Sequence, residues 1–206
     1  MSNRTQLRER LRLELGDTGS VQVWSDDLLD ALLVESVGWY SRLWPRQEAI
    51  HRDVVEGERT FSILAGTLGI TSVECPPGRV LPHEATGPVG APQSSGVRQS
   101  WSLWGDTLYL GRGASGDEVG ALKLVMQVLL PWPRLDPFEQ WPGPAGDERL
   151  LVLWSAVEAW AWLDGQDQKR GRPARSGVMV SRYTDELERE VAARRRAATS
   201  RVMSSG

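Results

Sequence analysis

The sequence has few residues that commonly build metal sites or disulfides: one cysteine and two histidines among 206 residues. A single cysteine, Cys75, excludes an internal disulfide and any cysteine-rich zinc site. His51 and His83 stand alone, without the second histidine, cysteine pair or spaced carboxylates that a metal site would need. We therefore predict no metal site and no cofactor, and we interpret Cys75 as a small buried apolar residue.

The chain also lacks long apolar runs and an excess of charge of one sign. No stretch of 18 apolar residues occurs, and the first ten residues contain no apolar signal core, so we expect a soluble cytoplasmic protein that does not bind membranes. The formal charge of −3 excludes the strong overall positive charge of many nucleic-acid-binding proteins. Ten tryptophans against two phenylalanines indicate partner surfaces as well as a core.

The most apolar segment, 147–164, predicts a central helix. Apolar residues recur at a helical spacing and also fill most of the remaining circumference, so neighbours must cover nearly every side. Asp147 is the predicted N-cap and Gly165 the predicted end. The polar Glu158 is expected to pair with Arg8 or Arg12 of a neighbouring helix. The residues expected to pack in the core or between subunits are Leu150, Trp154, Val157, Trp160, Trp24 and Leu28.

The rest of the chain predicts helices at both ends and strands in the middle. We predict helices over 5–15 with Thr5 as N-cap, over 25–44 with Ser25 as N-cap, and over 181–200 with Ser181 as N-cap. Short β-rich runs separated by Gly and Pro predict strands, and residues 81–96 predict a loop. The predicted strands are 59–65, 70–75, 99–104, 107–110 and 121–130.

This layout is an α+β protein: a helical bundle of two N-terminal and two C-terminal helices, with a β-rich insertion between them. The expected divisions are 1–56 for the N-terminal helices, 57–141 for the insertion, and 142–206 for the C-terminal helices and basic tail.

The charges of the last predicted helix are sorted along its length. Acidic residues occupy its first half, whereas Arg194, Arg195, Arg196 and Arg201 occupy its second half. One interpretation is a solvated helix whose charges match its dipole. The other is an arm that docks on a partner or a polyanion, because three consecutive arginines cover most of the helix circumference.

Candidates for catalytic chemistry are few. Residues 111–116 fit the pattern G-x-G-x-x-G, but the following segment has strand-like alternation and two prolines, and no acidic ribose ligand follows at the expected spacing. We favour a glycine-rich hairpin turn. No serine has a nucleophile-elbow context and no acidic cluster has metal spacing, so we predict no catalytic residues and no enzyme activity.

Several segments at the two helical ends form a recognisable combination. The N-terminal ones are LRERLRLELGD and the helix that begins WSDDLL and runs to YSRLWP. The C-terminal ones are DERLLVLWSAVEAW, the helix start YTDELE and the arginine run 194–196. Together these segments resemble the head-tail connector (adaptor, or head completion) proteins of tailed bacteriophages. The middle is similar only loosely, through 70–77 and 101–110, to the β-rich insertion of some adaptors.

The resemblance implies a structural protein of the virion neck, present in the host cytoplasm during assembly. Adaptors form rings, commonly dodecameric, beneath the portal protein, and they contact neighbouring adaptor subunits and a stopper or tail-side neck protein. Genomic double-stranded DNA passes through their channel without sequence-specific binding. By this analogy the last helix and tail engage the portal or another partner through Tyr183, Leu187, Val191, Arg194, Arg195, Arg196 and Arg201.

Two alternatives stay open. A DNA-binding regulatory protein would place the basic last helix in the major groove. A nucleotide-binding enzyme would use the loop 111–116.

Overall fold

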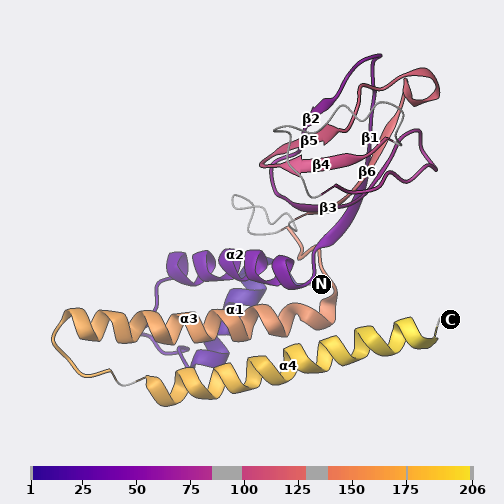
Figure 1. Ribbon diagram of the computed structural model, residues 1–206. Helices are drawn as coiled ribbons and strands as arrows, with labels where there is room; N and C mark the ends of the chain where they lie inside the picture. Colours follow the sequence, from indigo (N-terminus) through magenta and orange to yellow (C-terminus); the bar gives the residue numbers. More distant parts are fainter. Residues whose placement is uncertain (1, 85–98, 129–138, 175, 205–206) are drawn as a thin grey trace. The chain divides into compact units, whose positions relative to one another are not determined.

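The computed structural model describes residues 2–84, 99–128, 139–174 and 176–204, with side chains to residue 197. The chain divides into two compact units, which we call the helical unit and the β unit (Figure 1). The helical unit comprises Met1–Leu43 and Leu130–Gly206, and the β unit comprises Trp44–Leu129. The described residues form four α-helices and two small antiparallel sheets, which confirms the mixed α+β class.

The helices of the helical unit are α1 (Arg4–Leu15), α2 (Asp26–Leu43), α3 (Glu148–Lys169) and α4 (Gly177–Ser204). Helix α3 contacts each of the other three helices, as its apolar residues on several faces require. Its buried residues are Glu148, Leu150, Leu151, Val152, Leu153, Ser155, Ala156 and Ala159. They lie in the same unit as Leu7, Leu11, Leu29 and Leu33, which are fully buried on α1 and α2.

Local hydrogen bonds determine where the two N-terminal helices begin. Asn3, rather than the predicted Thr5, caps α1: its side chain accepts from the Gln6 amide at 2.9 Å, and the Gln6 side chain accepts from the Asn3 amide at 3.1 Å. Gly16 ends this helix at φ 70°, a left-handed conformation that glycine adopts without a steric penalty. Ser25 accepts from the Leu28 amide at 3.3 Å, in agreement with its predicted capping role.

The two C-terminal helices are longer than predicted. Gly165 does not end α3, which continues to Lys169 and includes part of the predicted linker. A glycine inside a helix costs only about 1 kcal/mol, and the flanking residues of α3 outweigh this cost. Helix α4 begins at Gly177, one turn before Ser181, so Ser181 is an internal residue rather than the N-cap.

The β unit contains two three-stranded sheets. One has the order β1 (Arg46–Arg52), β6 (Leu122–Val128), β3 (Thr67–Glu74); the other has the order β2 (Thr60–Ser62), β5 (Thr107–Leu110), β4 (Trp101–Trp104). Every pairing is antiparallel. Alternate residues of these strands face a shared core that includes Phe61, Val73, Trp101, Leu108, Leu122, Leu124 and Met126.

Strand β1 was not predicted, and it changes the boundary between the units. The β unit begins at Trp44, before β1, and ends at Leu129, whereas the sequence predicted an insertion over 57–141. The predicted loop over 81–96 falls mostly on 85–96, which lies outside the described residues.

Candidate functional site: the second half of helix α4

Helices α3 and α4 run antiparallel and are joined by polar contacts along their length. Near the connection between them, the Ser176 amide donates to Asp164 Oδ1 at 2.9 Å. Further along, Arg149 forms ion pairs with Glu186 and Glu190 of α4. These pairs fix which residues of α4 lie beside which residues of α3.

Arg194 lies level with the beginning of α3. Its Nη2 atom is 2.9 Å from Oδ2 of Asp147, the residue immediately before α3. Helix α4 continues for ten more residues, 195–204. At 1.5 Å per residue this is a projection of about 15 Å. In Figure 1 the yellow end of α4 accordingly continues past the start of α3.

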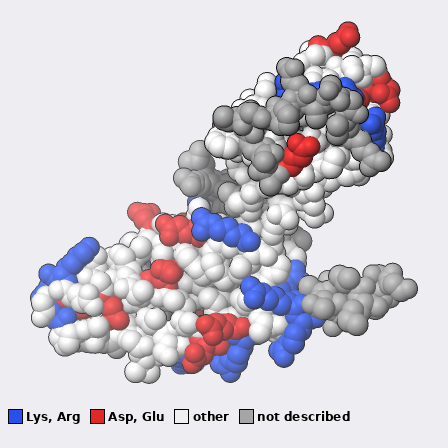
Figure 2. Space-filling view, viewed as in Figure 1, with Lys and Arg blue, Asp and Glu red and all other residues white. Residues whose placement is uncertain are grey.

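The beginning of this projection is basic and exposed. Arg195 and Arg196 are both exposed, whereas the Arg194 side chain is 26% exposed. Figure 2 shows basic side chains gathered where the described side chains of α4 end. Arginine side chains can bind carboxylates or phosphates in a bidentate geometry, so these two side chains are candidates for binding an anionic group.

Asp147 connects three segments of the helical unit. The sequence predicted that its side chain caps α3, but it makes no capping hydrogen bond. Instead its carboxylate accepts a hydrogen bond from the hydroxyl of Tyr40 on α2 and pairs with Arg194 on α4. Burial and this hydrogen bond raise the pKa of Tyr40 to about 12, although Arg194 acts in the opposite direction. We call Tyr40, Asp147 and Arg194 the α4 anchor.

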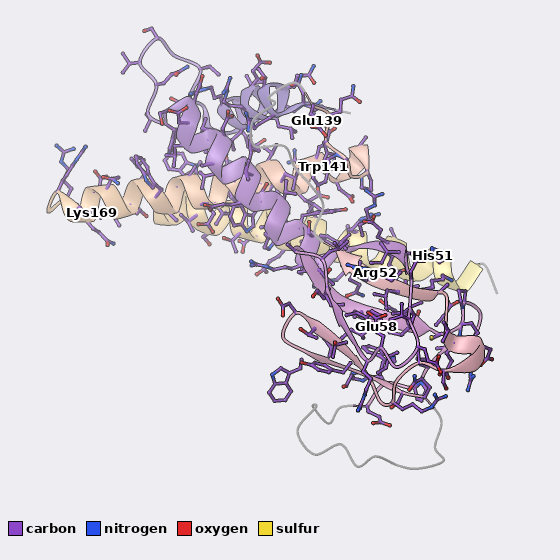
Figure 3. The ribbon with its side chains drawn as sticks, turned by 90° about the horizontal axis from the view of Figure 1, so that it is seen from above. His51, Arg52, Glu58, Glu139, Trp141 and Lys169 are labelled. Carbon is purple, nitrogen blue, oxygen red and sulfur yellow. The ribbon has the colours of Figure 1, made fainter. Side chains whose placement is uncertain are left out.

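Trp141, which precedes α3 in the chain, packs against Tyr40 of the α4 anchor. Its ring meets the Tyr40 ring edge-on, with centroids 5.4 Å apart, and its Nε1 atom donates to the Pro144 carbonyl at 3.2 Å. A Cβ atom on Gly143 would lie 2.3 Å from the Trp141 ring, so only glycine fits there. Figure 3 shows Trp141 near the beginning of α3 and Lys169 at its opposite end.

The other predicted interface residues lie in different environments. Tyr183 is 1% exposed, and its hydroxyl donates to the Glu14 carbonyl at 2.6 Å, so it packs within the chain. Leu187 and Val191 are half-buried. The side chain of Arg201 lies outside the described residues.

The predicted packing residues divide into two groups. Leu150 and Trp24 are buried, whereas Trp154, Val157, Trp160 and Leu28 are half-buried. Trp24 Nε1 donates to the Ala159 carbonyl at 3.0 Å, and its ring meets that of Trp160 edge-on at 5.0 Å. Trp154 stacks on Trp39 of α2 at 6.3 Å. All of these aromatic contacts lie within the helical unit, around α3.

The predicted pairing of Glu158 with Arg8 or Arg12 is wrong. Arg8 Nη1 lies 3.0 Å from Asp30, and Arg12 Nη1 lies 2.6 Å from Asp17. Arg12 also pairs with Asp26, and its hydrogen bond holds the pKa of Asp26 below its ordinary value. Both arginines therefore form ion pairs with aspartates of the N-terminal segment, and Glu158 is not among their partners.

The glycine-rich segment 111–116 connects β5 to a short 3₁₀ turn. Ala114 exchanges backbone hydrogen bonds with the 57–58 segment, and a Cβ on Gly113 would lie 2.8 Å from the Gly57 carbonyl oxygen. The close approach of two backbones therefore accounts for Gly113. Glu118, 1% exposed, pairs with Arg112 at 2.7 Å and closes the same turn.

Cys75, His51 and His83, the candidates for other chemistry in the sequence, all lie in the β unit. Cys75 is buried in the β unit, and burial raises the pKa of its thiol. His83 packs on Trp101, and His51 lies on β1. Figure 3 labels His51, Arg52 and Glu58 on the β unit. Within the ranges that the structure describes, no group of three or more His, Cys, Asp and Glu residues is placed to hold a metal ion.

None of the described helices combines the length and apolarity needed to cross a lipid bilayer. Comparison with protein-family models and with curated proteins found no match to this chain.

Proposed function

We propose that this chain is a structural head-tail adaptor of a tailed-phage neck, without enzymatic activity. In this proposal the four helices form the bundle typical of adaptors, and copies of the chain assemble as a ring, commonly dodecameric in this family. The ring lies beneath the portal protein, extends the DNA channel, and presents a surface to a stopper or tail-side neck protein.

One observation carries the proposal: helix α4 continues past the start of α3 and presents Arg195 and Arg196 on its exposed surface. Exposed arginines at such an end are suited to protein interfaces, where arginine is among the residues that contribute most binding energy. The resemblance of both helical ends to adaptors supports the portal as the partner.

The organisation of the chain also supports this proposal. Both chain ends build the helical unit, and the β unit is inserted between them. Buried residues of α3 and its ion pairs with α4 give the helical unit the rigidity that a ring subunit needs. The β unit has its own core and is free to carry a separate contact in the neck.

A co-assembly experiment tests the proposal. The full chain is mixed with the portal protein of the same genome, and complexes are measured by sedimentation and electron microscopy. We expect wild-type chain to bind the portal, and the double variant Arg195→Glu, Arg196→Glu to lose at least tenfold in affinity. Arg189→Glu, at another exposed position of α4, is the matched control and should bind normally.

A measurement of affinity for duplex DNA distinguishes the adaptor function from the DNA-binding alternative. An adaptor should show little affinity for free duplex DNA, whereas a regulatory DNA-binding protein should bind one duplex tightly with a steep dependence on salt. Absence of portal binding together with tight duplex binding would reject the adaptor function.

A further inference from the structure

We propose that Arg194 is a positioning residue: it holds α4 on Asp147 and Tyr40 so that Arg195 and Arg196 meet an acidic protein surface. This inference rests on the proposed function, because it assigns separate roles to the three arginines of the proposed docking helix. It also names the chemistry of the partner, a surface rich in carboxylates.

The three arginine side chains leave the helix in different directions. Consecutive residues of an α-helix are rotated by about 100°, so three neighbours cannot all face one side. Arg194 reaches Asp147 at the beginning of α3, whereas Arg195 and Arg196 are exposed. The arginine run is thus divided into Arg194, which contacts Asp147, and two residues with exposed side chains.

Asp147, which pairs with Arg194, is only 5% exposed. A carboxylate at this depth needs a cation and hydrogen-bond donors to offset its lost hydration. Tyr40 donates one hydrogen bond, and Arg194 supplies the cation at 2.9 Å. Removing Arg194 would leave a buried charge beside a neutral phenol, so α4 is held at this point by more than its apolar contacts.

The α4 anchor holds α4 at the point where this helix passes the start of α3. Glu190, one turn before Arg194, is paired with Arg149 on α3. Residues 195–204 follow the anchor and extend past the start of α3. The direction of this projection is therefore set by the last turn before it, the turn that Arg194 holds.

An acidic protein surface is the partner that these residues fit best. Two neighbouring arginines can each bind a carboxylate in a bidentate geometry. Duplex DNA presents a long row of phosphates, and tight binding to it through phosphates needs several such contacts. The described surface of this helix end offers the two exposed arginines 195 and 196, which suits a compact group of carboxylates.

The experiment compares Arg194→Met with Arg189→Met, at an exposed position of the same helix, and with the conservative Arg194→Lys in the full chain. Backbone amide hydrogen exchange of residues 190–197 is measured on the isolated protein. We expect about tenfold faster exchange in Arg194→Met, equivalent to about 1.4 kcal/mol of easier local opening, and no change in Arg189→Met. Arg194→Lys should restore most of the protection, because it keeps the cation. Far-ultraviolet circular dichroism verifies that each variant is folded.

Portal co-assembly of the same variants then tests the link to docking. Arg194→Met should weaken binding about tenfold although its own side chain lies against Asp147, and Arg194→Lys should bind nearly as well as wild type. Unchanged exchange in Arg194→Met would overturn the positioning role, whatever the binding result. Faster exchange with unchanged portal binding would overturn its link to docking.

Failure of the proposed function and failure of the positioning role give different experimental results. If the wild-type chain binds no portal, the adaptor function fails, while the exchange experiment still decides whether Arg194 holds α4. If Arg195→Met and Arg196→Met weaken binding to duplex DNA and leave portal binding intact, the acidic protein surface is the wrong partner.

Discussion

Replacing Trp24 by alanine should destabilise the helical unit strongly. Trp24 is 2% exposed, its Nε1 atom donates to the Ala159 carbonyl, and its ring packs edge-on against Trp160. A buried tryptophan removes about 150–250 Å² from water. At about 25 cal/mol per Å² this contributes about 4–6 kcal/mol, an upper estimate because the unfolded chain is already partly compact. Core Trp→Ala changes commonly cost about 3–5 kcal/mol, so we expect about 4 kcal/mol for Trp24→Ala.

Urea unfolding followed by circular dichroism at the helical signal measures this change, because the α-helices lie in the helical unit. Trp24→Phe is the matched control: it keeps most of the apolar volume and loses the hydrogen bond to the Ala159 carbonyl, for an expected loss of about 1–2 kcal/mol. A loss below about 1 kcal/mol in Trp24→Ala would refute the conclusion that this side chain fixes the segment between α1 and α2 onto α3.

Three further predictions concern other contacts. Trp160→Ala should lower the unfolding free energy by about 1–3 kcal/mol in urea unfolding, since the side chain is half-buried. Trp162→Ala should cost less than Trp160→Ala, because the Trp162 side chain is 39% exposed, and a larger loss in Trp162→Ala would contradict the assignment. Glu118→Gln should lower the unfolding free energy of the β unit by about 1–2 kcal/mol, because it weakens the pair with the partly exposed Arg112. An unchanged unfolding midpoint would contradict this prediction. Hydrogen bonds from Ser2 and Arg10 outweigh burial and lower the pKa of Glu148. Its stabilisation is therefore complete above about pH 4.3, the ordinary Glu value, and is lost as the pH falls through the lower folded value. Glu148→Gln should flatten the acid unfolding profile in this range, and an unchanged profile would reject the assignment.

The sequence predicted the helices well because their packing leaves a periodic signal. The apolar residues of 147–164 surround the helix, and α3 indeed contacts the other three helices. The N-terminal caps were less predictable, since both Asn3 and Thr5 are acceptable N-caps and only the reciprocal contact with Gln6 distinguishes them. Helix ends at Gly165 and Ser181 were wrong because a single glycine or serine is a weak stop or start signal when the flanking residues favour a helix.

The pattern of apolar and polar residues did not predict strand β1, and the reason is physical. It is an edge strand that pairs only with β6 among the described strands, and most of its residues are exposed, so Arg46–Arg52 carries no alternation of apolar and polar residues. The strands β3 and β6, which face the core, had alternating or apolar patterns and were predicted within a few residues.

The α4 anchor could be predicted only in part. The three arginines were recognised as a candidate interface, but sequence gives no rule for which of them turns inward. Asp147 is of a residue type that is favoured at the N-cap. Its pairing with Tyr40 and Arg194 depends instead on how α2 and α4 pack at the beginning of α3. The same limit explains the wrong partner for Glu158, because ion pairs between helices depend on tertiary packing rather than on spacing along the chain.

The most direct test of the adaptor function is electron cryomicroscopy of the neck of the phage particle whose genome encodes this chain. The proposal predicts a ring of copies beneath the portal, with residues 195–204 of α4 against an acidic portal surface and the DNA channel passing through the ring. A neck whose densities are all accounted for by other proteins, with no copies of this chain, would contradict it.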